Sequence, residues 1–236
     1  MKREIVLSER MQMVANMVSK GNILADIGCD HGFVSIYLVK NNICPRVIAM
    51  DVNEGPLLRA KEHIKEHDLA SYIDVRLSDG MEKLQPEEAD SILIAGMGGR
   101  LVIKILTECM DKAKALREII LQPQSELHLV RQFLTDNGFH ILQEDMVKDN
   151  GKFYPAMRVV WQEESPQDLS EEELWYGPLL LKQKNPVLWE YLTNEKAKYA
   201  QIAEDIEDKG NNTDKETKDM IHSRQSLIDR ALSCFG

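Results

Sequence analysis

The sequence predicts an α/β protein with a mostly parallel sheet, followed by a separate all-α domain. Short apolar runs alternate with helical patterns over residues 1–162, as is typical of βαβ units. Two extended runs flank Asn150-Gly151, a dipeptide that favours a tight hairpin. From residue 163 the strand patterns stop and acidic helical patterns continue to residue 236. We therefore expect five parallel strands, an antiparallel pair that completes a seven-stranded sheet, and domains at 1–162 and 163–236.

The elements of the first domain follow in order along the chain. Ser8 is expected to cap a helix that carries apolar residues at helical spacing and ends near Gly21. Ser125 is expected to cap a later helix that stops at Asn137-Gly138. The expected strands are 23–27, 45–51, 72–77, 89–95, 117–121, 139–147 and 153–161, and the helices between the first five strands are 33–40, 56–67 and 101–111.

The second domain is predicted from helix-start signals. Ser170-Glu171-Glu172-Glu173 and Thr213-Asp214-Lys215-Glu216 have the pattern of a capping box, and Asn185-Pro186 is typical of a helix N-terminus. The two long helices that follow Asn185 and Thr213 each carry an apolar stripe. We expect them to pack as an antiparallel, coiled-coil-like hairpin.

Composition and charge limit the class of protein. With 43% hydrophobic residues, the chain of 236 residues can bury a core. The net charge of −10 argues against nonspecific binding of nucleic acid, although a local basic face remains open. The four cysteines lack metal-ligand spacing and His63 and His67 lack a third ligand, so we expect reduced thiols and no metal. No apolar run reaches the ~20 residues of a membrane helix, so we expect a cytoplasmic protein.

Residues 26–32 (Asp-Ile-Gly-Cys-Asp-His-Gly) form the turn between the first strand and the next helix. Gly28 and Gly32 permit a sharp bend and close approach of a ligand to the main chain. Asp30 stands where a dinucleotide fingerprint would have its second glycine. With Asp26 it would repel a pyrophosphate and attract a cation. S-adenosylmethionine, which carries a sulfonium and an ammonium, therefore suits this turn better than NAD does.

Carboxylates also end the second and third strands. Asp51 can accept hydrogen bonds from both ribose hydroxyls of a nucleoside, and Val52 and Asn53 are expected beside it. Asp79 is placed to accept from an adenine amine, while Gly80 permits close approach. An Asp-Gly pair alone indicates only a turn. As the third strand-ending carboxylate, Asp79 becomes a candidate pocket residue.

A glycine-rich loop follows the fourth strand, where ligands bind in open α/β sheets. Ala95 and Gly96 are expected in the cofactor pocket, and Met97 and Gly98 beside the reacting methyl group. The loop is neither Asn-Pro-Pro-Phe nor Asn-Pro-Pro-Tyr, which argues against methylation of an exocyclic amine.

Four further side chains are candidates with open alternatives. Arg10 would pair with the carboxylate of the cofactor or lie on the surface. Gln122 and Tyr154 would hold a target base, although Tyr154 fits equally well in the core. His31 would touch the methionyl end of the cofactor, move a proton from the base, or simply pack.

Five motifs together resemble the bacterial TrmK family of tRNA (adenine-22-N1)-methyltransferases. They are Leu7-Ser8-Glu9-Arg10, residues 26–32, Ser78-Asp79-Gly80, residues 95–99 and Leu121-Gln122-Pro123. The resemblance implies a class I, Rossmann-like S-adenosylmethionine domain with a C-terminal coiled-coil-like domain. It also implies cofactor contacts at Asp26, Gly28, Asp51, Asp79 and Gly80, with Met97 and its neighbours near the target base. The target nucleoside and its position follow from the resemblance alone.

We therefore expect a monomeric enzyme that uses S-adenosylmethionine to methylate N1 of an adenine in tRNA. Adenine N1 has a free lone pair, so orientation rather than a strong base would supply most of the rate. One alternative is a methyltransferase acting on a small molecule or protein, which would need no RNA. Another is a noncatalytic binding module, which would be indicated by a failure to bind S-adenosylmethionine.

Overall fold

The computed structural model describes residues 5–163, 168–208 and 215–236. The chain divides into two compact units, Met1–Gln167 and Asp168–Gly236. The boundary lies five residues after the expected one at 162, at the end of a segment (164–167) that is outside the described residues.

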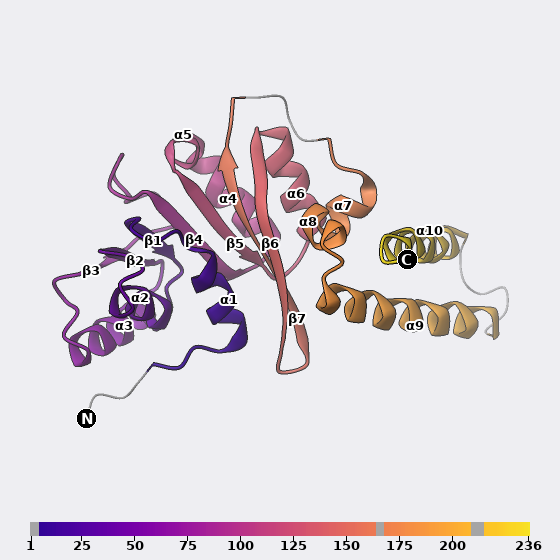
Figure 1. Ribbon diagram of the computed structural model, residues 1–236, viewed down its shortest axis with the longest axis horizontal. Coiled ribbons are helices and arrows are strands. Elements are labelled where there is room, and N and C mark those ends of the chain that lie inside the picture. Colours follow the sequence, from indigo (N-terminus) through magenta and orange to yellow (C-terminus); the bar gives the residue numbers. More distant parts are fainter. Residues whose placement is uncertain (1–4, 164–167, 209–214) are drawn as a thin grey trace. The chain divides into compact units, whose positions relative to one another are not determined.

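Unit 1 contains a seven-stranded sheet with the strand order β3-β2-β1-β4-β5-β7-β6 (Figure 1). β1 to β5 pair in parallel, and β7 pairs antiparallel with both β5 and β6. The expectation of five parallel strands and an antiparallel pair is confirmed. The strands are β1 Leu24–Ile27, β2 Val47–Asp51, β3 Ile73–Leu77, β4 Ser91–Met97, β5 Glu118–Pro123, β6 Phe139–Asp149 and β7 Lys152–Trp161.

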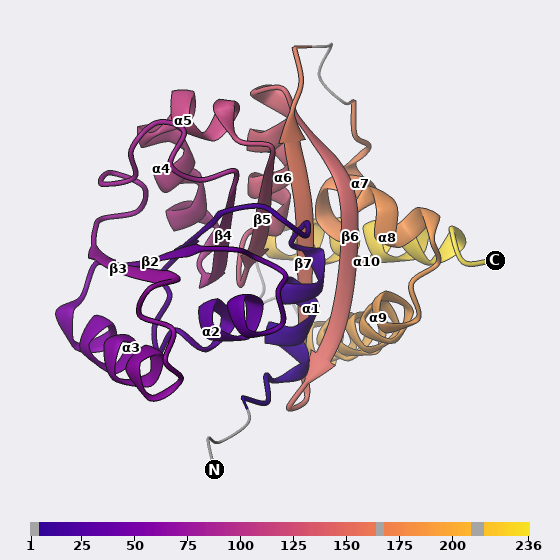
Figure 2. The ribbon, with the colours of Figure 1, turned by 60° about the vertical axis from the view of Figure 1, so that its left-hand side comes forward.

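Helices cover both faces of the sheet (Figure 2). Because of this double cover, every residue of β1, β2 and β5 is buried, which explains their nearly continuous apolar sequences. One face carries α1 Glu9–Met17, α2 Phe33–Lys40 and α3 Glu54–Glu66, and the other carries α4 Gly99–Glu108, α5 Met110–Ala115 and α6 Leu127–Asp136.

Two helix boundaries depart from the sequence expectations. The Ser8 cap is confirmed, but α1 stops at Met17 because the next residue is extended. The single helix expected at 101–111 is divided at Cys109, whose backbone is not helical.

The expected Ser125 cap is wrong. α6 begins after Glu126, and the Ser125 hydroxyl instead accepts the backbone N–H of Gly99 at 3.2 Å, in the first turn of α4. The serine thus satisfies a helix N-terminus, but that of a neighbouring helix rather than its own.

The β6–β7 hairpin has the expected turn, with positive φ at both Asn150 (49°) and Gly151 (78°). An ion pair between Arg131 of α6 and Glu144 of β6 joins the hairpin to the helix layer. Arg131 Nε and Nη2 each lie 3.0 Å from Glu144 Oε1, and the two side chains are 1% and 0% exposed. The pair is therefore withdrawn from solvent.

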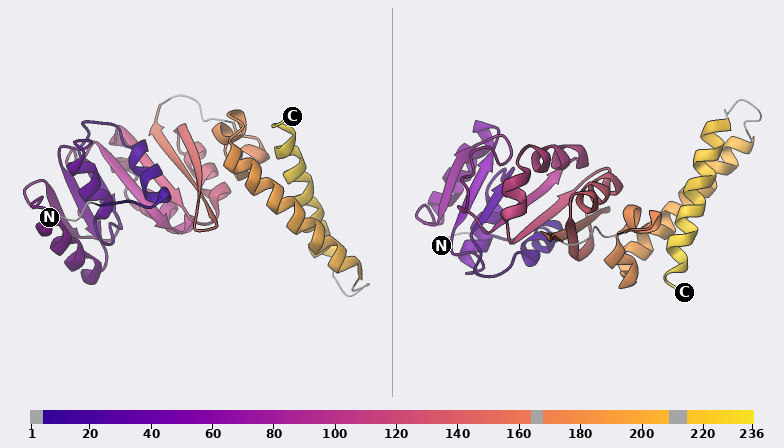
Figure 3. Two further views of the ribbon diagram at one scale, coloured as in Figure 1. Left: turned by 60° about the horizontal axis from the view of Figure 1, so that its bottom comes forward. Right: turned by 90° about the horizontal axis from the view of Figure 1, so that it is seen from above.

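Unit 2 consists of helices in its described residues, and α9 and α10 run side by side (Figure 3). The capping box at Ser170 is confirmed, and Asn185 Oδ1 accepts the N–H groups of Val187 and Leu188. The capping box expected at Thr213 lies outside the described residues. The helices are α7 Glu171–Tyr176, α8 Pro178–Lys182, α9 Pro186–Asp208 and α10 Lys215–Ser233.

Among all the helices of the described segments, we find none with the length and apolar character needed to span a bilayer.

Candidate active site

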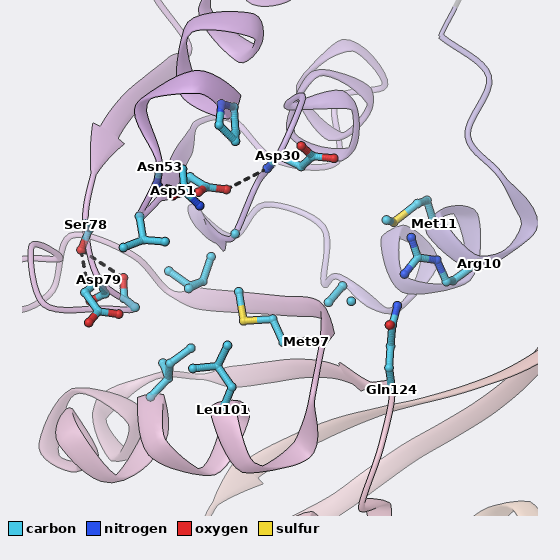
Figure 4. Close-up of a pocket in the computed structure, with 18 residues that line it drawn as sticks. Arg10, Met11, Asp30, Asp51, Asn53, Ser78, Asp79, Met97, Leu101 and Gln124 are labelled. Carbon is cyan, nitrogen blue, oxygen red and sulfur yellow. Dashed lines mark hydrogen bonds between the residues drawn. The ribbon is translucent and has the colours of Figure 1, made fainter.

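A pocket of about 480 Å³ lies in unit 1 at the carboxyl ends of the first four strands. Parallel strands bring the residues that follow them to one edge of the sheet. In Figure 4, Asp51, Asn53 and Asp79 lie at one end of the pocket and Arg10 and Gln124 at the other. Met97 lies between them, so the pocket has an acidic end and an end with a guanidinium and a carboxamide.

Asp51 is held at the acidic end by its own loop. One carboxylate oxygen accepts the N–H of Asn53 at 2.9 Å and the other accepts the N–H of Asp30 at 3.3 Å. These bonds join the turn after β1 to the turn after β2. A carboxylate oxygen can accept more than one hydrogen bond, so Asp51 can still accept hydrogen bonds from a ligand in the pocket. Val52 and Asn53 line the pocket beside it.

Asp79 projects from the loop after β3, and its side chain is 57% exposed. The Ser78 hydroxyl shapes this loop by donating to the Gly80 carbonyl at 3.1 Å and accepting the Lys83 N–H at 3.1 Å. Gly80 has φ +50°, and a side chain there would come within 3.0 Å of Ile105. The glycine therefore allows the loop to approach α4 while Asp79 faces the pocket mouth.

The glycine-rich loop after β4 continues the pairing of β4 with β5. Gly96 is an extra residue in the ladder, with φ +80°, and its N–H donates to Gln122 Oε1 at 3.2 Å. The Met97 carbonyl accepts the Gln124 N–H at 2.9 Å. The loop is therefore bound on both sides of the bulge, with Ala95, Gly96 and Met97 lining the pocket.

Gly28 lies against the side chain of Met97. A Cβ built on Gly28 would overlap Met97 Cε, whereas one built on Gly151, which has nearly the same φ (78° against 75°), would meet nothing within 4 Å. We expect Gly28→Ala to displace Met97 into the pocket and weaken S-adenosylmethionine binding about tenfold, the cost of a modest overpacking.

The matched control for Gly28→Ala is Gly151→Ala, measured by calorimetry beside it. Both variants place alanine at positive φ and should lose about 1 kcal/mol of stability, but only Gly28→Ala should lose affinity. Adding Met97→Ala to Gly28→Ala should recover part of the loss. Equal affinities of the two single variants would contradict this account of the contact.

Arg10 reaches the pocket from α1. Its Nη1 donates to Gln122 Oε1 at 3.2 Å, its guanidinium lies 5.2 Å from the centre of the Tyr154 ring, and its N–H donates to Asp149 at 3.3 Å. The alternative of a surface arginine is wrong, because the side chain is held against the sheet.

Gln122 and Tyr154, the expected holders of a base, do not line the pocket in the structure. Gln122 is fully buried and its oxygen is taken by Arg10 and Gly96. Tyr154 packs against the core on its other side. Both therefore lie behind Arg10 and position it.

Four other candidate residues lie outside the pocket lining. Gly98 packs against Ser125, and Gly32, with φ +72°, lets α2 approach α3, since a side chain there would come within 3.2 Å of Ala60. The His31 ring stacks with Phe33 and His63 at centroid distances of 5.7 and 5.8 Å. Its Nε2 lies 3.5 Å from Asp30 Oδ1, and the three roles considered for His31 stay predictions. The fourth residue is Asp26.

Asp26 is buried under the turn and accepts a hydrogen bond from the Ser35 hydroxyl at 2.6 Å. Burial raises the pKa of Asp26 from 3.8 to about 6, while the bond from Ser35 lowers it and the charge of Asp51 raises it further. The folded protein therefore keeps this proton when the unfolded chain has lost it, so stability should fall by up to about 3 kcal/mol as the pH rises from about 4 to about 6.

Asp26→Asn should remove this dependence. The amide oxygen can still accept from Ser35 and carries no buried charge, so we expect about 1–2 kcal/mol of added stability above pH 7. Urea denaturation at pH 4.5 and 7.5 would measure the difference in the free energy of unfolding between the wild type and Asp26→Asn. A wild-type protein that is more stable than Asp26→Asn at both values would contradict the burial of an ionised Asp26.

Seven lining residues were not named as candidates from the sequence. Most are apolar and form the pocket walls, a role that hydrophobicity alone does not distinguish from the core. Ser78 and Gln124 are the exceptions, because they follow the third and the fifth strand as the chosen carboxylates follow theirs. The seven are Met11, Ile27, Pro56, Ser78, Leu101, Ile105 and Gln124.

The described segments contain no group of three or more His, Cys, Asp and Glu side chains that could hold a metal ion. His63, a candidate ligand in its spacing from His67, instead places Nδ1 3.0 Å from the His31 carbonyl oxygen.

Comparison with known proteins places this chain in a family. The family model TrmK, described as tRNA (adenine(22)-N(1))-methyltransferase, matches residues 24–226. The tRNA (adenine(22)-N(1))-methyltransferase of Bacillus subtilis (strain 168) is 33% identical over 96% of this chain and 98% of its own.

Solved structures agree over nearly the whole chain. Streptococcus pneumoniae Sp1610, in complex with S-adenosyl-L-methionine, has a TM-score of 0.86 and 32% identity over 96% of this chain and 100% of its own. M. capricolum TrmK, in complex with S-adenosyl-homocysteine, has a TM-score of 0.85 and 25% identity over 98% and 99%. The chain belongs to the TrmK family of tRNA (adenine(22)-N(1))-methyltransferases.

Proposed function

We infer that the protein transfers the methyl group of S-adenosylmethionine to N1 of adenine 22 in tRNA. The observation that carries this inference is the pocket at the carboxyl ends of β1 to β4, with Asp51 and Asp79 at one end, in a chain of the TrmK family. S-adenosylmethionine supplies an electrophilic methyl group when it is bound.

The residues of the acidic end fit the adenosyl part of the donor. Asp51, oriented by two backbone N–H groups, would accept from the ribose hydroxyls, and Asp79 from the adenine amine. Val52, Leu101 and Ile105 offer apolar surface for the adenine ring. Gly28, Asp30, Asn53, Gly80, Ala95 and Gly96 line the rest of the proposed donor site.

The charges of the pocket fit the methionyl part. The carboxylates of Asp30 and, beneath the turn, Asp26 would favour the cationic sulfonium and ammonium, and Arg10 would bind the carboxylate. Since Gln122 and Tyr154 hold Arg10 in place, little side-chain entropy is lost on binding.

Methyl transfer to adenine N1 depends mainly on the orientation of the base relative to the methyl group. Adenine N1 attacks with its own lone pair, so no residue need remove a proton first. The chain's task is to hold a base that has left its stack with N1 in line with the methyl group. Met97, next to the bulge, offers a flexible apolar surface at this point of the pocket.

The proposal includes the rest of the chain. The α9–α10 hairpin forms a coiled-coil-like domain together with α7 and α8. It is supported by buried seam residues such as Leu188, Leu192 and Leu227 and by the Lys196–Asp229 ion pair at 2.7 Å. The enzyme acts as a cytoplasmic monomer, where tRNA is available, and without a metal, since N1 needs no Lewis acid to attack a sulfonium methyl.

Methyl transfer to an unmodified tRNA transcript tests the function. With labelled S-adenosylmethionine we expect one methyl group per tRNA, recovered as 1-methyladenosine by mass spectrometry. A transcript with uridine in place of adenine 22 should take none. Transfer to a protein or small molecule without RNA, or no transfer at all, would refute the proposal.

A further inference from the structure

Gln124 is a polar side chain of the pocket that the donor-binding residues leave unused. Its backbone is fixed by the N–H bond to the Met97 carbonyl at 2.9 Å. Its side chain is exposed and lines the pocket, and within the described segments it has no hydrogen-bond partner. The carboxamide therefore offers both a donor and an acceptor to a ligand.

The surroundings of Gln124 keep that carboxamide accessible. It lies at the end of the pocket away from Asp51 and Asp79 (Figure 4). A side chain on Gly96 would come within 3.7 Å of Gln124 Nε2 and 3.3 Å of Arg10 Nη1. The glycine thus leaves free the space between the carboxamide and the guanidinium.

Methylation at N1 determines which edge of adenine remains for recognition. N1 lies on the Watson–Crick edge and must face the methyl group. The exocyclic N6 and the ring atom N7 lie on the Hoogsteen edge, which stays free. There adenine presents one donor and one acceptor, and guanine presents two acceptors.

A carboxamide complements the Hoogsteen edge of adenine. Its oxygen accepts from N6–H and its nitrogen donates to N7, the pairing that Asn and Gln make with adenine. A guanidinium instead complements guanine, and Arg10 already donates to Gln122. The chemistry therefore selects Gln124 over Arg10 as the residue that distinguishes the base.

We propose that Gln124 recognises the target base as adenine, with Oε1 accepting from N6 and Nε2 donating to N7. The proposal rests on the proposed function and adds a specificity-determining residue to it. It assigns the end of the pocket that contains Asp51 to the adenosyl part of the donor, and the end that contains Arg10 and Gln124 to the methionyl carboxylate and the target base.

The test compares Gln124→Met with the wild type on two tRNAs, one with adenine and one with 7-deazaadenine at the target position. Methionine keeps the length of the side chain and removes its hydrogen bonds. We expect 7-deazaadenine, which lacks the N7 acceptor, to lower kcat/KM about tenfold in the wild type and not at all in Gln124→Met. Any change that 7-deaza substitution makes in N1 reactivity affects both enzymes equally and cancels in this comparison.

Two further measurements separate base recognition from donor binding and from misfolding. Gln124→Met should lower kcat/KM on the adenine tRNA about 10- to 100-fold while its Kd for S-adenosylmethionine changes less than twofold, which also establishes that it folds. The control Gln132→Met, on the exposed face of α6, should keep the wild-type penalty for 7-deazaadenine.

A penalty for 7-deazaadenine that persists in Gln124→Met would overturn the proposal. So would a Kd for S-adenosylmethionine that rises as much as kcat/KM falls, since Gln124 would then bind the donor. A wild type that methylates both tRNAs equally refutes only the role of Gln124. A wild type that methylates neither refutes the proposed function itself.

Discussion

Replacing Asp51 with alanine is expected to weaken S-adenosylmethionine binding by roughly 100- to 10,000-fold, the loss of two hydrogen bonds to a charged acceptor at about 1.5–3 kcal/mol each. Asp51 is 9% exposed, and the N–H groups of Asp30 and Asn53 fix the orientation of its carboxylate. It therefore meets a ribose without further ordering. Titration calorimetry would measure the change.

Two variants make the Asp51 experiment specific. Asp51→Asn keeps the shape of the side chain and one acceptor oxygen. Its Kd for S-adenosylmethionine should therefore lie between that of the wild type and that of Asp51→Ala. Asp111→Ala removes a carboxylate from the exposed part of α5 and should leave the Kd unchanged. A loss below fivefold in a folded Asp51→Ala would place the ribose elsewhere.

Arg131→Met is expected to destabilise the protein by about 3–5 kcal/mol, because it removes the guanidinium that forms an ion pair with the buried carboxylate of Glu144. Both side chains are almost completely buried, and two guanidinium nitrogens lie 3.0 Å from the same oxygen. Urea denaturation would measure the loss. The affinity for S-adenosylmethionine at low denaturant should change little, since neither residue lines the pocket.

The double variant Arg131→Met/Glu144→Leu separates charge from packing. It replaces both charges by apolar groups of similar length and should recover most of the lost stability. Arg100→Met breaks an ion pair with Glu126 in which the arginine is 78% exposed, and it should barely move the midpoint. A double variant as unstable as Arg131→Met would show that packing, and not the broken ion pair, determines the loss of stability.

The sheet could be predicted because its strands are buried on both faces. Such strands are continuous apolar runs, and the alternation of runs with helical patterns predicts their parallel order. The failures occurred where a polar side chain acts across elements. Ser125 has the local pattern of a cap, yet its hydroxyl serves Gly99 on another helix, and no local pattern identifies that partner.

Contacts between elements also decide which of the predicted site residues lie in the pocket and which do not. The rule that ligands bind where parallel strands end located Asp51 and Asp79, because it depends only on topology. The rule does not predict that the Asp26 carboxylate accepts a hydrogen bond from Ser35 instead of lining the pocket. Nor could it tell Gln122 from Gln124, since strand alternation places residues two apart on one face but does not say where the strand gives way to the loop.

The bulge at Gly96 has a consequence for how the loop can change. One extra residue in β4 separates two pairs that are otherwise in step, Ala95 with Gln122 and Met97 with Pro123. Met97 still pairs with Pro123 beyond the bulge, so the extra residue lengthens β4 alone and leaves the alternation of side chains after it unchanged. Deleting Gly96 would restore a regular ladder and remove the N–H that donates to Gln122 Oε1. The path of the loop beside Arg10 therefore depends on one inserted glycine.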